Sequence, residues 1–120
     1  CHLKAPKDTD NHIVLVDPST NNPNLAKDEP DSETAEFAPR VRLDHPDLAG
    51  AKLQALIAAS PQKALLVRVT GLQMFDSEHS LGRHLKRHNN WEIHPVMGLD
   101  YCPNGKTCTA GSDANWKKLG

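Results

Sequence analysis

Aromatic side chains, net charge and long apolar runs are all scarce in this chain of 120 residues. Phe, Trp and Tyr make up 4% of it, which argues against a stacking platform for single-stranded nucleic acid. The formal net charge is −1, so charge does not favour nucleic acid or an anionic membrane as a partner. No apolar run approaches the ~20 residues of a transmembrane segment. The hydrophobic fraction of 38% instead predicts a globular protein, with a single domain over residues 1–120.

Cysteine is also rare, with three residues in the chain. Cys102 and Cys108 bracket PNGKT, where Asn-Gly favours a tight reversal that brings the two thiols within reach of each other. We therefore predict a Cys102–Cys108 disulfide and, because disulfides persist in oxidising compartments, an extracellular or periplasmic protein of the bacterial envelope. Cys1 is either the lipidated first residue of a lipoprotein or a residue inside a longer domain; its thiol is lipidated, free or paired elsewhere.

Alternation of apolar and polar residues predicts a chain made mainly of β-strands with one helix. The predicted strands are HIVLV (12–16), TAEFAPRVRL (34–43), ALLVRVTGLQMF (64–75) and WEIHPVMGLDYC (91–102), and the predicted helix is 46–59. Between and after them lie a long loop (17–32), a polar, basic excursion (76–90) and a polar tail (103–120). Pro39 lacks an amide donor and predicts an edge strand or a bulge, and Gly71 predicts a bulge or sharp bend in the third strand.

The order strand, strand, helix, strand, strand matches a small five-stranded Greek-key barrel of the OB type from which the first strand is missing. That strand either precedes Cys1, is supplied by residues 1–7, or is borrowed from another chain. A barrel without one strand has two open edges, and open edges pair with strands of other chains. The pattern therefore also predicts strand-swapped or filamentous self-association.

Four segments carry a resemblance: DTDNHIVLV, TAEFAPRV, VRVTGLQMFDSEH and NNWEIHPV. In this order they resemble the motifs D-x-H-x-V-L, E-F-x-P, V-x-V-T-G-x-x-x-F-D-x-x-H and W-E-I-H-P-V of uncharacterised exported bacterial proteins with an OB-like domain. The resemblance covers about residues 8–101. It implies an OB-like fold and export, and it implies no known reaction. In that group a further segment precedes the position of Cys1.

Three acid–histidine pairs recur at short spacing: Asp10 with His12, Asp76 with His79, and Glu92 with His94. Residues two apart on a strand share a face, so converging strand ends would gather these side chains. Mixed carboxylate and imidazole ligands suit zinc, manganese or iron(II). The same pairs equally suit buried hydrogen bonds that only hold the fold together, or metal-free acid–base catalysis. In either catalytic case the first candidates are His79, Asp76 and His94.

A second cluster, GRHLKRHNN, places cations and imidazoles together in the excursion. Its candidates for an anion-binding patch, for phosphate or a sugar acid, are Arg83, His84, Arg87 and His88. The alternative is a solvated loop. No nucleophile elbow, phosphate-binding loop, paired CxxC motif or dinucleotide turn is present.

Three functions remain open at this point. The first is an exported OB-like module that binds an unknown ligand, with nucleic acid or saccharide as candidates that charge does not favour; Arg40, Arg42 and Arg68 would line its groove. The second is a small metal-dependent, nuclease-like hydrolase that uses the acid–histidine pairs. The third is a structural subunit that assembles by strand addition. Nothing in the sequence establishes an enzyme, and the binding module is the leading hypothesis.

Overall fold

The structure is a computed structural model that describes residues 11–44, 50–79 and 87–119, with the backbone alone for residues 42–44. The predicted residues Asp10, Arg83 and His84, and the segment 1–7, lie outside the described residues.

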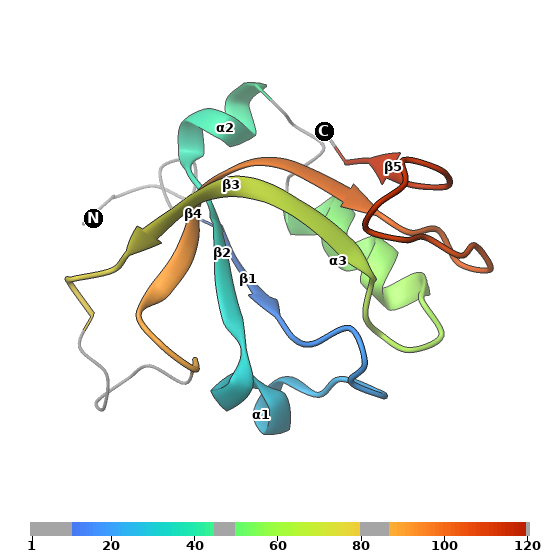
Figure 1. Cartoon of the computed structure of the whole chain (residues 1–120), viewed down its shortest axis with the longest axis horizontal. Helices are drawn as coiled ribbons and strands as arrows, with labels where there is room; N and C mark the ends of the chain where they lie inside the picture. The colour runs from blue at the N-terminus through green and yellow to red at the C-terminus, as the bar shows by residue number, and fades with distance from the viewer. Residues whose placement is uncertain (1–10, 45–49, 80–86, 120) are drawn as a thin grey trace.

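A mixed β-sheet dominates the described part of the chain (Figure 1). Its strands are β1 (Asn11–Leu15), β2 (Glu33–Phe37), β3 (Val67–Phe75), β4 (Trp91–Tyr101) and the short β5 (Lys117–Lys118). The order is β1-β2-β4-β3, with β5 paired to β4, and β2 and β4 run parallel while the other pairs are antiparallel. The mainly β prediction is confirmed. Within the described residues the sheet does not close, and β1 and β3 form its two ends.

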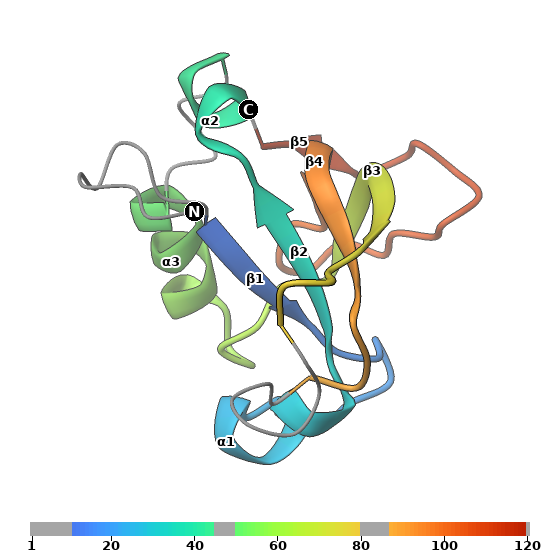
Figure 2. The same ribbon diagram turned by 90° about the vertical axis from the view of Figure 1, so that its left-hand side faces the viewer.

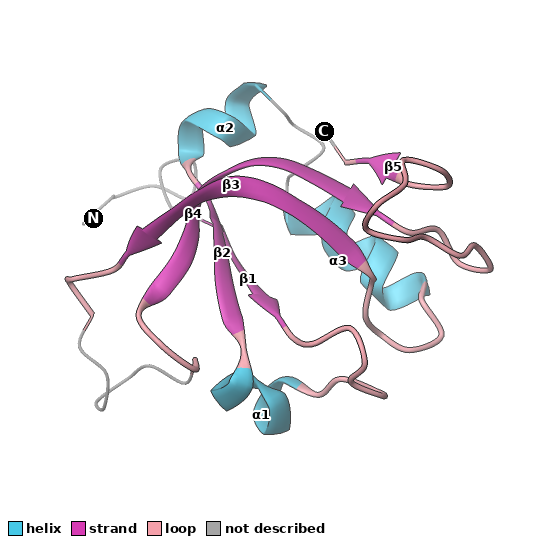
Figure 3. Cartoon of the chain, in the orientation of Figure 1, coloured by secondary structure: helices cyan, strands magenta, loops and turns pink. Residues whose placement is uncertain are grey.

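The helices are more numerous than the sequence predicted (Figure 3). They are α1 (Leu25–Asp28), the 3₁₀ helix η2 (Glu29–Asp31), α2 (Pro39–Asp44) and α3 (Gly50–Ala59). The predicted loop 17–32 therefore contains two short helices, and the Asn24 side chain caps α1 by accepting from the Ala26 N–H at 3.0 Å.

The strand predicted over residues 34–43 is about twice as long as the observed β2. β2 ends at Phe37, and the chain turns into α2 at Pro39. Proline at a first helical position has its φ already set, and its missing N–H would have no partner there. Pro39 thus starts a helix, where the sequence predicted an edge strand or a bulge.

The core lies on one face of the sheet. Its buried residues are Ala35, Phe37, Val96, Leu99 and Leu119. Leu53 and Leu56 of α3 pack against this cluster, which agrees with the helical spacing seen in the sequence. The tail contributes too, because the Leu119 N–H donates to the Leu99 carbonyl at 2.8 Å and brings the end of the chain back over β4.

Gly71 marks a bulge between β3 and β4, as predicted. The register shifts between Thr70 and Gly71 and again before Gln73. A Cβ at Gly71 would lie 2.5 Å from the Ile93 side chain and 2.7 Å from the Pro95 carbonyl oxygen. The two long strands bend together in this region and arch over β1 and β2 (Figures 1 and 2). The bend turns the sheet into a curved half-shell with the core on its inner side.

Candidate functional site

The two faces of the curved sheet differ in chemistry. On β2, Ala35 and Phe37 belong to the apolar core, whereas Glu36 between them points to the opposite face. On β4, Ile93 packs against the core, whereas Glu92 and His94 on either side of it approach Glu36. The inner face is therefore apolar, and the outer face carries acids and histidines.

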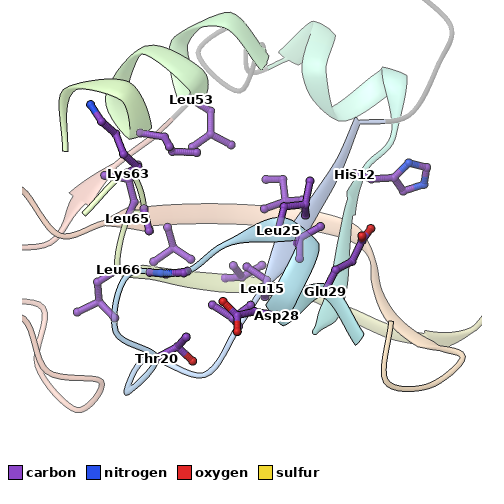
Figure 4. Close-up of a pocket in the computed structure, with 18 of the residues that line it drawn as sticks. His12, Leu15, Thr20, Leu25, Asp28, Glu29, Leu53, Lys63, Leu65 and Leu66 are labelled. Carbon is purple, nitrogen blue, oxygen red and sulfur yellow. The ribbon is translucent and has the colours of Figure 1, made fainter. Parts of the chain in front are cut away.

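An apolar groove of about 1060 Å³ opens on the inner side of the sheet (Figure 4). It is bordered by β1 and the start of β3, the two ends of the sheet, together with α1 and α3. Its apolar lining includes Ile13, Leu15, Leu53, Ile57, Val67 and Val69. Two further lining residues, Leu25 and Leu66, are 61% and 42% exposed.

On the outer face, Glu36, Glu92 and His94 each bring one potential ligand atom to within 4.8 Å of the others. The Glu36 and Glu92 side chains are only 9% and 4% exposed. His94 Nδ1 lies 3.4 Å from Glu92 Oε1 and 3.9 Å from Glu36 Oε2. That Nδ1 atom is buried and makes no hydrogen bond within the described residues. This trio offers a mixed oxygen and nitrogen ligand set for a metal ion.

His12 joins the edge of the trio from β1. It is paired with Glu36 in the β1–β2 register, and its Nε2 lies 3.1 Å from Glu36 Oε2. The ring is mostly exposed and points away from the groove (Figure 4). Three adjacent strands thus contribute acids or histidines to one cluster.

Arg87 connects this cluster to a second acid–histidine pair. Its guanidinium donates to Glu92 Oε2 at 2.8 Å through Nη1 and to Asp76 Oδ2 at 2.6 Å through Nη2. Burial acts to lower the pKa of Arg87, but the two carboxylates outweigh it and raise the pKa above its usual value. Arg87 therefore remains a cation, and it orients both acids.

Asp76 lies at the exit of β3 and accepts several hydrogen bonds. His79 Nδ1 is 2.7 Å from Asp76 Oδ2, and the backbone N–H groups of Glu78 and His79 donate to Oδ1. Burial acts to raise the pKa of Asp76, but these donors and Arg87 outweigh it and hold the pKa below its ordinary value. Asn90 donates to the Asp76 and His79 carbonyls, so this corner of the sheet is fixed by polar contacts.

The predicted metal residues thus fall into two groups. Glu92 and His94 meet each other, and they meet Glu36, whereas Asp76 and His79 pair separately and do not join a three-ligand group within the described residues. Asp10 lies outside the described residues. The hydrolase hypothesis required Asp76, His79 and His94 around one metal, and no such group is present in residues 11–44, 50–79 and 87–119.

Two of the four residues of the predicted anion-binding patch, Arg87 and His88, are described. Arg87 is 7% exposed and engages two carboxylates. His88 is exposed and donates its backbone N–H to the Ser32 carbonyl at 3.0 Å. Arg83 and His84 lie outside the described residues, so the patch stays a prediction there.

Two of the three arginines expected around a groove, Arg40 and Arg68, are not among the residues that line the apolar groove. Arg68 donates to Asp100 at 2.6 and 2.9 Å and to Asp113 at 2.8 Å, and it lies against the Trp116 ring. Arg40 is exposed on α2, and the side chain of Arg42 is not described. Arg68 instead ties the tail to β3 and β4.

Glu36 lies in the predicted strand 34–43, but it was not among the predicted metal ligands. Its position between two apolar residues in AEF marks a side chain on the polar face of a strand. Only the parallel pairing of β2 with β4 brings it to His94. The apolar lining of the groove was also not predicted, because the groove forms between elements far apart in the sequence.

The predicted disulfide is confirmed. Cys102 and Cys108 are bonded with a Cα–Cα separation of 5.9 Å, which is consistent with an extracellular or periplasmic protein. Among the described residues, no helix is long and apolar enough to span a membrane. No protein-family model matches the chain, and neither a curated protein nor a solved structure matches it.

Proposed function

We propose that this protein is an exported, OB-like binding module whose groove between β1 and β3 receives an extended β-strand. The observation that carries the proposal is the coincidence of two features. The apolar groove opens between β1 and β3, and these are also the two ends of the sheet. An extended peptide would find apolar pockets and two strand edges in the same place.

The strand directions support this occupant. β1 is antiparallel to β2, β2 is parallel to β4, and β4 is antiparallel to β3. β1 and β3 therefore run in the same direction. One inserted strand, running the opposite way, can form antiparallel ladders with both of them.

The resulting order would be that of an OB barrel. With the inserted strand counted first, β1, β2, β3 and β4 become its second, third, fourth and fifth strands, and α3 falls between the third and fourth. The parallel pairing of β2 with β4 fits the pairing of strands three and five in that topology. The proposed barrel is thus completed by its ligand.

The occupant proposed here is a peptide with apolar residues at alternate positions. Inward-facing residues would contact Ile13, Leu15 and Val69, and outward-facing ones would remain in water. Backbone hydrogen bonds would supply affinity with little dependence on sequence, and the groove would select the inward side chains.

A phage-displayed library of random peptides tests the proposal. The peptides should be about ten residues long, which is enough for one strand and its flanking residues. Selected peptides should show a period of two in their apolar residues. Leu66→Asp and Leu25→Asp should each weaken binding of the strongest peptide by at least ~10-fold, since each places a charge in an apolar groove.

Met97→Asp is the matched control, because Met97 is 61% exposed, as Leu25 is, but lies on β4 and does not line the groove. It should bind the peptide as the wild type does. Failure to select any periodic peptide, or equal binding by the wild type and both groove variants, would contradict the proposal. If a second copy of the chain fills the groove instead, sedimentation should show oligomers that depend on concentration, and the library should yield no binding peptide. That result would also contradict the proposal.

A further inference from the structure

We propose that Glu36, Glu92 and His94, with His12 as a fourth ligand, bind a divalent transition-metal ion such as zinc on the outer face of the sheet. The trio lies on the face of the sheet opposite the groove, and His12 on β1 borders both. Three properties of the cluster favour a metal ion: the spacing of its atoms, its burial and the way in which neighbouring side chains orient it.

The spacing already fits a single ion. Ligand atoms around tetrahedral zinc lie about 3.4 Å apart, because each Zn–N or Zn–O bond is about 2.1 Å long. His94 Nδ1 is 3.4 Å from Glu92 Oε1 and 3.9 Å from Glu36 Oε2, and His12 Nε2 is 3.1 Å from that same Oε2. Small side-chain rotations would place Glu36, Glu92 and His94 on one metal. His12 contacts Glu36 but lies outside this group of three, so its ring would have to move further to become the fourth ligand.

Burial makes a cation favourable here. Glu36 and Glu92 are each more than nine-tenths buried, and their oxygens lie within 4.8 Å of each other. Two carboxylates at this distance, out of water, repel each other, and a dication between them relieves the repulsion. The buried Nδ1 of His94 makes no hydrogen bond among the described residues, and its lone pair is the donor that a transition metal takes.

Arg87 orients the Glu92 carboxylate for metal binding. It holds Oε2 at 2.8 Å, which leaves Oε1 facing His94. Metal-binding carboxylates are commonly fixed in this way by a hydrogen bond on the oxygen that does not face the ion. Asp76, on the other side of Arg87, fixes the guanidinium in turn.

The donor set indicates the class of metal. Imidazole nitrogen favours zinc and its transition-metal neighbours, whereas a site for calcium or magnesium uses oxygen ligands. Two carboxylates and two imidazoles therefore favour zinc, with manganese(II) as the second candidate, over magnesium.

The test is zinc binding by the purified protein, measured by equilibrium dialysis and elemental analysis, with magnesium as the comparison ion. The wild type should bind one zinc ion per chain and prefer it to magnesium. His94→Ala and Glu36→Gln should each lose at least about 100-fold in zinc affinity, since loss of an outer partner alone costs 10–100-fold. His12→Ala should give a smaller loss.

His79→Ala is the matched control, because His79 also contacts a carboxylate but lies outside the trio. It should bind zinc as the wild type does. Thermal unfolding gives a second readout, since a ligand that binds only the folded state raises the unfolding temperature. Zinc should raise the unfolding temperature of the wild type and of His79→Ala, and it should not raise that of His94→Ala. Equal zinc binding by His94→Ala and the wild type, or no binding by the wild type, would overturn the proposal.

Discussion

At the scale of single residues, the corner between β3 and β4 is held by charge-assisted hydrogen bonds. Asp76 is 11% exposed and receives the Arg87 guanidinium, the His79 ring and two backbone N–H groups. Hydrogen bonds of this kind stabilise the folded state more than neutral ones do. The sequence spacing predicted the Asp76–His79 pair correctly but gave no indication of Arg87 as its partner.

Asp76→Asn should lower the free energy of unfolding by about 2 kcal/mol at neutral pH, because it removes charged acceptors from buried donors. The pKa of Asp76 is lower in the folded protein than in the unfolded chain. Its stabilisation is therefore complete above the ordinary Asp pKa of about 3.9 and is lost as the pH falls through the folded-state pKa. Urea unfolding across this range should show the two proteins converging in acid.

Asp113→Asn is the control for this series. Asp113 also pairs with an arginine, Arg68, but its side chain is 93% exposed. An exposed ion pair contributes little to stability because water and salt screen it, so this variant should stay close to the wild type at every pH. A loss as large as that of Asp76→Asn would show that the burial of Asp76 does not matter.

At the scale of elements, the β3–β4 ribbon gives the sheet its curvature. It is the longest pairing in the sheet, and its register shifts on both sides of Gly71. A bulge adds local bend and twist to a pair of strands. The curvature places β1 and β3 on either side of the groove, so the bulge contributes directly to the proposed binding site.

Gly71→Ala should destabilise the protein by about 1–3 kcal/mol, the usual range for forcing a methyl group into a packed interior. The added Cβ would meet Ile93 and the Pro95 carbonyl at 2.5 and 2.7 Å. Gly98→Ala on the opposite strand is the control, because its Cβ would meet nothing closer than 3.8 Å. Chemical denaturation should show a clear shift of the midpoint for the first variant alone; equal midpoints would refute the steric explanation.

At the scale of the whole molecule, the C-terminal segment completes the core. Leu119 is buried against Leu99, and the segment between is held by the Cys102–Cys108 disulfide and by Arg68 with Asp113. The sequence predicted a polar tail over residues 103–120, but it did not predict that the end of this tail returns to the core. The burial of Leu119 and the pairing of β5 with β4 show that the tail belongs to the fold.

Replacing Cys102 and Cys108 together by Ser should cost about 2 kcal/mol of stability, the loop-closure entropy of a short disulfide loop. Adding a reductant should lower the unfolding midpoint of the wild type and leave that of the double variant unchanged. A double variant as stable as the oxidised wild type would show that the hydrogen bonds of the tail suffice without the disulfide.

Local sequence patterns were sufficient to predict the strands around HIVLV, VRVTGLQMF and WEIHPV, the helix ending at Ala59, the bulge at Gly71 and the disulfide. These features depend on alternation, helical spacing and turn residues, all of which act between near neighbours in the chain. The acid–histidine pairs within one strand or turn were visible for the same reason.

The pairing of strands, by contrast, became visible only in the folded chain. The parallel pairing of β2 with β4 joins segments more than fifty residues apart and brings Glu36 to His94. Likewise, β1, α3 and β3 line the groove only because the sheet curves. Such contacts depend on chain topology and on the burial of a shared core, for which no local pattern in the sequence provides a signal.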